Sequence, residues 1–319
     1  MKWFEAPAAL LAWVGRKGTL VVAASIFVGL GVPGLAALVR PWLSEALVAM
    51  LILAFLRVDT DELRRHFTQP ALIAAATVWI MLVTPALLGV FFVLFGLDRQ
   101  TPDLFFILVL QMAAPGLTSS PALAALMGLD VALTLASLVV CFALTPLTAS
   151  FFNNLFLGNV VISPYELGFR LFLIIAGSAL TAFAVRKIGG RAFIEAQRER
   201  IDGLSVLAMF LFAVAAMDGV TDHFRADPSL VLKLTALAFV LALGSIAITT
   251  LIFLRAGRAR ALAIGIIAGN RNIGLMMAAT GFAVPDTAWL YFGLAQFPIY
   301  LLPHLLKPLA MRLGRSADR

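Results

Sequence analysis

Charged residues are scarce in this chain, and their scarcity restricts the class of protein it can be. Only 13% of the 319 residues are Asp, Glu, Lys or Arg, whereas 62% are hydrophobic and the mean hydropathy is +1.00. A soluble domain has about 25% charged and about 45–50% apolar residues. The composition therefore argues against an ordinary soluble domain and predicts an all-α membrane protein.

Cysteine and histidine are almost absent. The single Cys141 excludes an intramolecular disulfide framework and a Cys-rich metal site, and the scattered His66, His223 and His304 do not make a metal site. The sequence also contains no phosphate-binding loop and no nucleophile elbow. We therefore expect no enzyme activity, no cofactor and no bound metal.

Basic residues outnumber acidic ones by 24 to 17, and the isoelectric point is near 10.2. Such an excess can indicate nucleic-acid binding, but here the basic residues lie in short loops between apolar runs. The predicted partner is therefore the lipid bilayer and not nucleic acid. The apolar runs predict ten membrane spans, at about residues 19–38, 42–56, 71–95, 104–127, 130–152, 165–185, 202–218, 229–254, 261–283 and 287–306.

The distribution of basic residues predicts the orientation of these spans. If both termini are cytoplasmic, 18 of the 24 basic residues face the cytoplasm, and only Arg40, Arg99 and Arg225 lie in outer loops. This bias favours ten spans in the inner (plasma) membrane with both ends inside. Residues 3–14 are predicted to form a short amphipathic helix at the membrane surface.

Two predicted spans contain polar residues, glycine or proline in their middle. The fourth has Pro115 and Pro121 around a Thr-Ser-Ser run, and the ninth has Gly269-Asn-Arg-Asn before Gly274. Backbone that leaves the helix inside a bilayer must be buried in protein or line a cavity. The interruptions are five spans apart, which predicts two inverted five-helix repeats with broken helices 4 and 9 crossing mid-membrane. Secondary transporters have this arrangement.

The order of several short motifs resembles the bile acid:sodium symporter family over most of the chain. Each motif is weak alone, and their order and spacing together carry the resemblance. The motifs are Pro41-Trp42-Leu43, Thr84-Pro85-Ala86, Pro115 to Pro121, Gly128 to Thr134, Thr145-Pro146-Leu147, and Asn272 to Leu275.

The resemblance implies a single transmembrane unit over 1–319 with two subdomains. Spans 1, 2, 6 and 7, at about 19–56 and 165–218, would form a panel. Spans 3–5 and 8–10, at about 71–152 and 229–306, would form a core.

The resemblance also implies two sodium sites at the helix crossing, but most of their ligand positions differ here. Ser120 and Thr134 alone keep an oxygen. The other family ligands align with Ile80, Pro121, Leu138, Ile267 and Arg271. Hard cations need several oxygen ligands, so we expect no sodium coupling through these sites.

Arg271 is the charged residue predicted to lie inside a span, and it therefore needs a partner or an aqueous cavity. Its guanidinium could replace the sodium and hold the broken helices together through exposed carbonyls or the hydroxyls of Thr118, Ser119 and Ser120. It could also contact an anionic substrate, because the guanidinium suits carboxylates. A purely structural lock is the remaining alternative.

The other polar residues within spans have both a structural and a ligand-binding interpretation. Asn270 and Asn272 flank Arg271 and could satisfy loose backbone groups or contact the ligand. Gln111, Gln296 and Thr134 are each more often helix-packing residues than ligand contacts. Asp130 is expected to cap a helix, and no embedded carboxylate is an evident proton carrier.

Together these features predict a secondary transporter that moves a small or amphipathic organic anion by alternating access. The alternatives are a facilitator that uses no ion gradient, a sodium-coupled symporter with relocated ion sites, and a membrane sensor that binds its ligand without transport. The sequence does not specify the substrate, the direction of transport or the oligomeric state.

Overall fold

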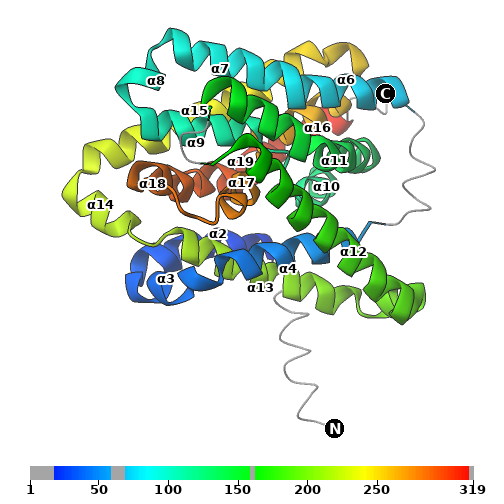
Figure 1. Cartoon of the computed structure of the whole chain (residues 1–319). Coiled ribbons are helices and arrows are strands. Elements are labelled where there is room, and N and C mark those ends of the chain that lie inside the picture. Colours follow the sequence, from blue (N-terminus) through cyan, green and yellow to red (C-terminus); the bar gives the residue numbers. More distant parts are fainter. Residues whose placement is uncertain (1–17, 59–68, 159–161, 316–319) are drawn as a thin grey trace. The chain divides into compact units, whose positions relative to one another are not determined.

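The structure is a computed structural model and describes residues 18–58, 69–158 and 162–315. The helix predicted at residues 3–14 and both chain ends lie outside these ranges. Within them the secondary structure is helical, apart from an isolated bridge between Gly116 and Arg271. The all-α prediction is therefore confirmed for the described part of the chain (Figure 1).

Among the described residues, six helical stretches are long and apolar enough to cross a membrane. Their outward faces carry large apolar side chains such as Leu94, Leu147 and Ile188, which are 78%, 71% and 88% exposed. Soluble proteins rarely expose extended apolar surface of this kind, so these helices indicate a membrane-embedded protein. The six stretches are Pro33–Leu56, Pro70–Leu94, Val131–Phe156, Pro164–Gly190, Arg198–Ala226 and Pro228–Ile252.

By its contacts the chain divides into two compact units, here called unit 1 (residues 1–59 and 174–231) and unit 2 (residues 60–173 and 232–319). The long helices α12 (Pro164–Ala196) and α15 (Pro228–Ile252) begin in one unit and end in the other. The division into a supporting panel and a transporting core, expected from the sequence, remains a prediction.

Unit 1 is built around α13 (Arg198–Ala216). Helices α2 (Gly18–Gly31) and α4 (Leu43–Leu56) pack against it, and Figure 1 shows them lying alongside it. The connection between them consists of α3 (Pro33–Val39) and the 3₁₀ turn η1 (Arg40–Trp42), and α14 (Val220–Ala226) follows α13.

The first predicted span, 19–38, is interrupted in unit 1. Val32 leaves the helical conformation, with φ −129° and ψ 71°, between α2 and α3. The cause is Pro33, because a proline disfavours the helical conformation of the residue before it. Prolines begin several other helices as well, since the first helical position needs no N–H partner. Such prolines are Pro70, Pro102, Pro164 and Pro228.

Unit 2 contains both broken helices. Apart from its parts of α12 and α15, unit 2 consists of α6 (Pro70–Val78), the π-helical turn η2 (Trp79–Val83), α7 (Thr84–Leu94), α8 (Leu97–Gln100), α9 (Pro102–Ala113), α10 (Ser120–Leu126), α11 (Val131–Phe156), the 3₁₀ turn η3 (Leu254–Ala256), α16 (Arg258–Gly269), α17 (Ile273–Ala279), α18 (Asp286–Leu294) and α19 (Gln296–Arg315).

Both predicted interruptions are present in unit 2. One lies between α9 and α10, and the other between α16 and α17. Helix α16 approaches α15 closely through two glycines four residues apart, Gly265 and Gly269. A Cβ atom at Gly269 would lie 2.6 Å from the Ala242 carbonyl oxygen, and one at Gly265 would lie 2.8 Å from that of Ile246. Small residues at this spacing allow close helix approach in membranes, and they fix the end of α16 where the second interruption begins.

Candidate functional site at the meeting of two broken helices

The two interruptions pair with each other as short antiparallel backbone segments. The Leu117 amide donates to the Asn270 carbonyl at 2.8 Å, and the Asn272 amide donates to the Pro115 carbonyl at 2.8 Å. Backbone groups that leave a helix in the protein interior must find other partners. Here each broken helix supplies partners for the other, so the two breaks form one structural feature, the crossing.

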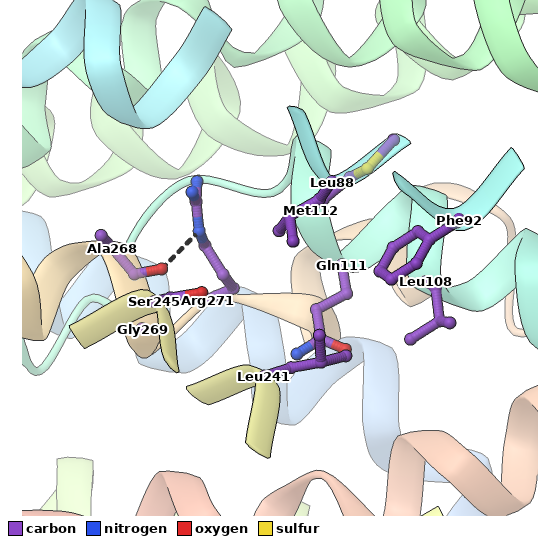
Figure 2. Close-up of a pocket in the computed structure, with 10 residues that line it drawn as sticks. All are labelled: Leu88, Phe92, Leu108, Gln111, Met112, Leu241, Ser245, Ala268, Gly269 and Arg271. Atoms are coloured by element: carbon purple, nitrogen blue, oxygen red, sulfur yellow. Dashed lines mark hydrogen bonds between the residues drawn. The ribbon is translucent and has the colours of Figure 1, made fainter. Parts of the chain in front are cut away.

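The Arg271 side chain is buried in the crossing, and only 5% of it is exposed. Its Nε donates to the Ala268 carbonyl at 2.7 Å. Its Nη1 donates to the carbonyls of Ile80 at 3.0 Å and Ala114 at 2.9 Å. Figure 2 shows the guanidinium extending away from Gln111, with the bond from Nε to Ala268 drawn. The charge is therefore held by backbone oxygens of three chain segments.

Local backbone geometry leaves each of these three carbonyl oxygens without an amide donor in its own helix. Ala114 directly follows the end of α9, and Ala268 lies one residue before the end of α16, where carbonyls lose their intrahelical partners. Ile80 lies in the π-helical turn η2, in which the Thr84 amide bonds to the Trp79 carbonyl. The next residue is Pro85, which has no N–H to offer Ile80.

The guanidinium has no carboxylate partner among the described residues, and its Nη2 has no hydrogen-bond partner there either. Burying an unpaired charge is costly. The C-terminal ends of α9 and α16 both lie at the crossing, and helix C-termini carry partial negative charge. These two dipoles and the three carbonyls therefore compensate the charge in place of an acidic side chain.

Three positions at which the motif resemblance predicts sodium ligands are apolar and buried. Ile80 and Ile267 are fully buried and belong to a hydrophobic cluster with Met81, Cys141 and Ala268. Leu138 is 5% exposed. Ile267 also fills the space beside Gly116, where a Cβ atom would lie 2.4 Å from its Cγ2. None of these three side chains can coordinate a hard cation.

Asn270 and Asn272 are both buried and have different roles. The Asn272 side chain accepts from the Leu275 amide at 3.1 Å and so caps α17. Asn270 contributes its backbone carbonyl to the pairing, while its Oδ1 has no hydrogen-bond partner among the described residues.

The three hydroxyl residues of the first interruption lie at the start of α10. Thr118 and Ser119 are half-buried, and Ser120 is fully buried with an Oγ that has no partner among the described residues. Arg271 donates to the carbonyls of Ile80, Ala114 and Ala268 and not to these hydroxyls. The sequence left open whether carbonyls or hydroxyls are the partners of Arg271, and the structure shows that they are carbonyls.

Thr134 and Gln296 each bond to the backbone carbonyl four residues earlier in the chain. The Thr134 hydroxyl donates to the Asp130 carbonyl at 2.7 Å, and the Gln296 Nε2 donates to the Phe292 carbonyl at 3.1 Å. Asp130 caps α11 through the Leu133 amide, as expected, and lies 3.4 Å from the Arg260 Nε. These residues support helices around the crossing and do not converge on Arg271.

A cavity of about 20 Å³ adjoins the crossing. This is room for about one water molecule, so no organic anion fits it in this conformation. Gln111 and Ser245 contribute polar side chains to its wall, and the buried Gln111 Oε1 has no hydrogen-bond partner among the described residues. The lining residues, drawn in Figure 2, are Leu88, Phe92, Leu108, Gln111, Met112, Leu241, Ser245, Ala268, Gly269 and Arg271.

Comparisons with known proteins add no name to this site. No family model matches the chain, and no curated protein matches it significantly. The resemblance based on short motifs therefore stays a prediction, and the function has to be argued from the site itself.

Proposed function

We propose that this protein is a secondary transporter that carries a small or amphipathic organic anion across the cell's inner membrane by alternating access. The observation that carries the proposal is the pairing of two broken helices at the crossing, with a buried cation in it. Interrupted helices at a shared polar site are the recurrent substrate and ion sites of such transporters.

The proposal includes ten spans in two inverted repeats, with both termini in the cytoplasm. Three interrupted pairs supply spans beyond the six long helical stretches: α9 with α10, α16 with α17, and α18 with α19. A break divides each pair, and every member except the 20-residue α19 has 12 residues or fewer, so length alone does not mark these shorter members as spans. The tenth span is α2, which has 14 residues and is joined to α4 through α3 and η1.

Alternating access requires two bodies that move against each other around the binding site. The two compact units of the chain support this part of the proposal. Unit 2 contains the crossing, and unit 1 would serve as the support against which it moves.

Transport without sodium coupling follows from the chemistry of the crossing. Arg271 already satisfies three carbonyl oxygens, and apolar side chains occupy three of the positions where the family resemblance expects ligands. A fixed positive charge that has no carboxylate partner in the described part of the chain also favours an anionic substrate nearby. These features support the facilitator and the uncoupled carrier over the ordinary symporter.

A thermal-stability screen of the purified protein tests the proposal. The probes are monocarboxylates, dicarboxylates, amphipathic carboxylates, sulfonates and phosphate esters, each in sodium and in potassium chloride. A ligand that binds the native state raises the unfolding temperature. We expect at least one anion class to do so equally in both salts.

Two glutamine variants locate the binding. Gln111→Leu changes the wall of the cavity at the crossing, which would widen to admit an anion in the course of alternating access. Gln296→Leu changes a buried glutamine outside that wall, whose Nε2 donates to the Phe292 carbonyl. The stabilisation should be lost in the first variant and kept in the second. Stabilisation that requires sodium would contradict the uncoupled carrier, and no stabilisation by any anion would contradict the proposed substrate class.

A further inference from the structure

The three carbonyl oxygens of Ile80, Ala114 and Ala268 surround two nitrogens of one guanidinium. They come from η2, from the end of α9 and from the end of α16. All three distances to Arg271 lie between 2.7 and 3.0 Å. This set of oxygens is named the three-carbonyl site below.

The oxygens of this site belong to the backbone, and features other than Arg271 hold them in place. Because Pro85 has no N–H, the Ile80 carbonyl has no donor within its own helix. The hydrogen bond from the Asn272 amide to the Pro115 carbonyl holds the ends of α9 and α16 together. Shortening the Arg271 side chain would therefore leave three converging oxygens with no donor. Rings of backbone carbonyls bind monovalent cations in membrane proteins.

We infer that the three-carbonyl site is a monovalent-cation site which Arg271 permanently fills, and that a free cation of the guanidinium class binds there once the side chain is shortened. The planar group with several N–H donors matches the contacts that Arg271 makes. A sodium or potassium ion would meet the same three oxygens and would complete its shell with water. The inference concerns binding only, so it can fail or hold whether or not the protein transports anions.

Replacement of Arg271 by alanine, with rescue by ethylguanidinium, tests this site. Ethylguanidinium corresponds to the part of the arginine side chain that Arg271→Ala removes. We expect the variant to unfold at least about 5 °C below the unmodified protein. Millimolar ethylguanidinium should restore most of that difference in a saturable manner, and choline at the same concentration should not.

Arg170→Ala is the matched control. Arg170 is half-exposed, pairs with Glu166 and reaches one carbonyl, that of Ala279, at 3.4 Å. Ethylguanidinium should give this variant no larger shift than it gives the unmodified protein. The same measurement on Arg271→Ala with sodium chloride and with potassium chloride shows whether the site also accepts a metal ion. Rescue by either ion would support a cation site as well. The inference is overturned if Arg271→Ala is folded and no cation stabilises it more than Arg170→Ala.

A measurement on the unmodified protein covers the case in which Arg271→Ala does not fold. In protein labelled with ¹⁵N-arginine, the Nε proton of Arg271 should exchange with solvent at least about 100-fold more slowly than that of Arg99. The Arg99 side chain is 90% exposed and serves as the internal reference. Arg271→Lys assigns the resonance by removing it. Equal exchange rates for the two arginines would show that Arg271 does not fill a closed site.

Discussion

Two arginine ion pairs of unit 1 and the buried Arg271 of unit 2 lie in different environments. In unit 1, Arg40 pairs with Asp218 at 2.8 Å and Arg57 pairs with Asp202 at 2.6 Å, and all four side chains reach solvent. In unit 2, Arg271 is buried and bonds only to backbone carbonyls among the described residues. A carboxylate compensates the charge in the first case, and interrupted helices compensate it in the second.

The difference follows from helix continuity. The ion pairs of unit 1 lie at the two ends of α4 and α13, so the apolar middle of each helix contains no charge. An unbroken helix satisfies its own backbone and has no free carbonyl to offer. A break, or the π-helical turn that contains Ile80, leaves carbonyls without an intrahelical donor inside a span, and these carbonyls compensate the buried cation. The following predictions compare the two environments, from the largest expected effect to the smallest.

The largest loss of stability is expected for Arg271→Met. Methionine keeps an unbranched side chain as far as the position of Nε but leaves three buried carbonyls without donors, so the free energy of unfolding should fall by about 3–5 kcal/mol. Arg271→Lys should lose less, because it keeps the charge. Reversible unfolding in detergent measures both. Equal losses for Lys and Met would show that charge at the crossing contributes nothing.

A steric change beside the crossing should cost nearly as much. In Gly269→Val, the new side chain would overlap the Ile246 side chain and the Ala242 carbonyl of α15, and we expect a loss of about 2–4 kcal/mol. Gly244→Ala is the control, since a Cβ atom there meets no other atom within 4 Å. That variant should be neutral or slightly stabilising. A neutral Gly269→Val would mean that α16 does not depend on this close contact.

A smaller effect is expected at the start of α17. Asn272→Ala removes the side chain that accepts from the Leu275 amide, which should cost about 1 kcal/mol. The exposed Asn154→Ala provides a comparison without a cap. Thermal unfolding of both variants measures the difference. If Asn272→Ala loses no more stability than Asn154→Ala, Asn272 does not act as a cap.

The smallest effect is expected in unit 1. Arg40→Gln breaks a half-exposed ion pair with Asp218, and such pairs contribute about 0.2–1 kcal/mol. The loss should shrink further in high salt, because salt screens exposed charges. A loss in unit 1 as large as that of Arg271→Met would remove the contrast between the two environments.

The sequence predicted the two interruptions because proline, glycine and polar residues stand out in apolar runs. Pro115 and the Gly269-Asn-Arg-Asn run marked both places, and Arg271 was recognised as a charge in need of partners. The break at Val32 was missed, although Pro33 was a visible signal for it.

The partners of Arg271 were harder to predict. Two of its three acceptors are carbonyls of alanine, and a backbone group leaves no trace in residue identity. Ile80 is an acceptor because of a π-helical turn followed by Pro85, and the pair Thr84-Pro85 was the available clue. Ser245 was missed because nothing in the sequence shows that α15 lies beside the crossing. Thr134 was a candidate because the family resemblance places a ligand there, and Gln296 because it is polar within a span. Neither signal distinguishes a bond to a nearby backbone carbonyl from a ligand contact.

The measurement that tests the central claim most directly is uptake into proteoliposomes of the anion that stabilises the protein most. Uptake is followed with an inward sodium gradient and again with potassium in place of sodium, using Gln111→Leu and Gln296→Leu beside the unmodified protein. The account predicts equal uptake in both salts, reduced in Gln111→Leu and unchanged in Gln296→Leu. Uptake that requires the sodium gradient would make the protein a coupled symporter. Binding without uptake in either salt would make it a sensor, and either result would contradict the account.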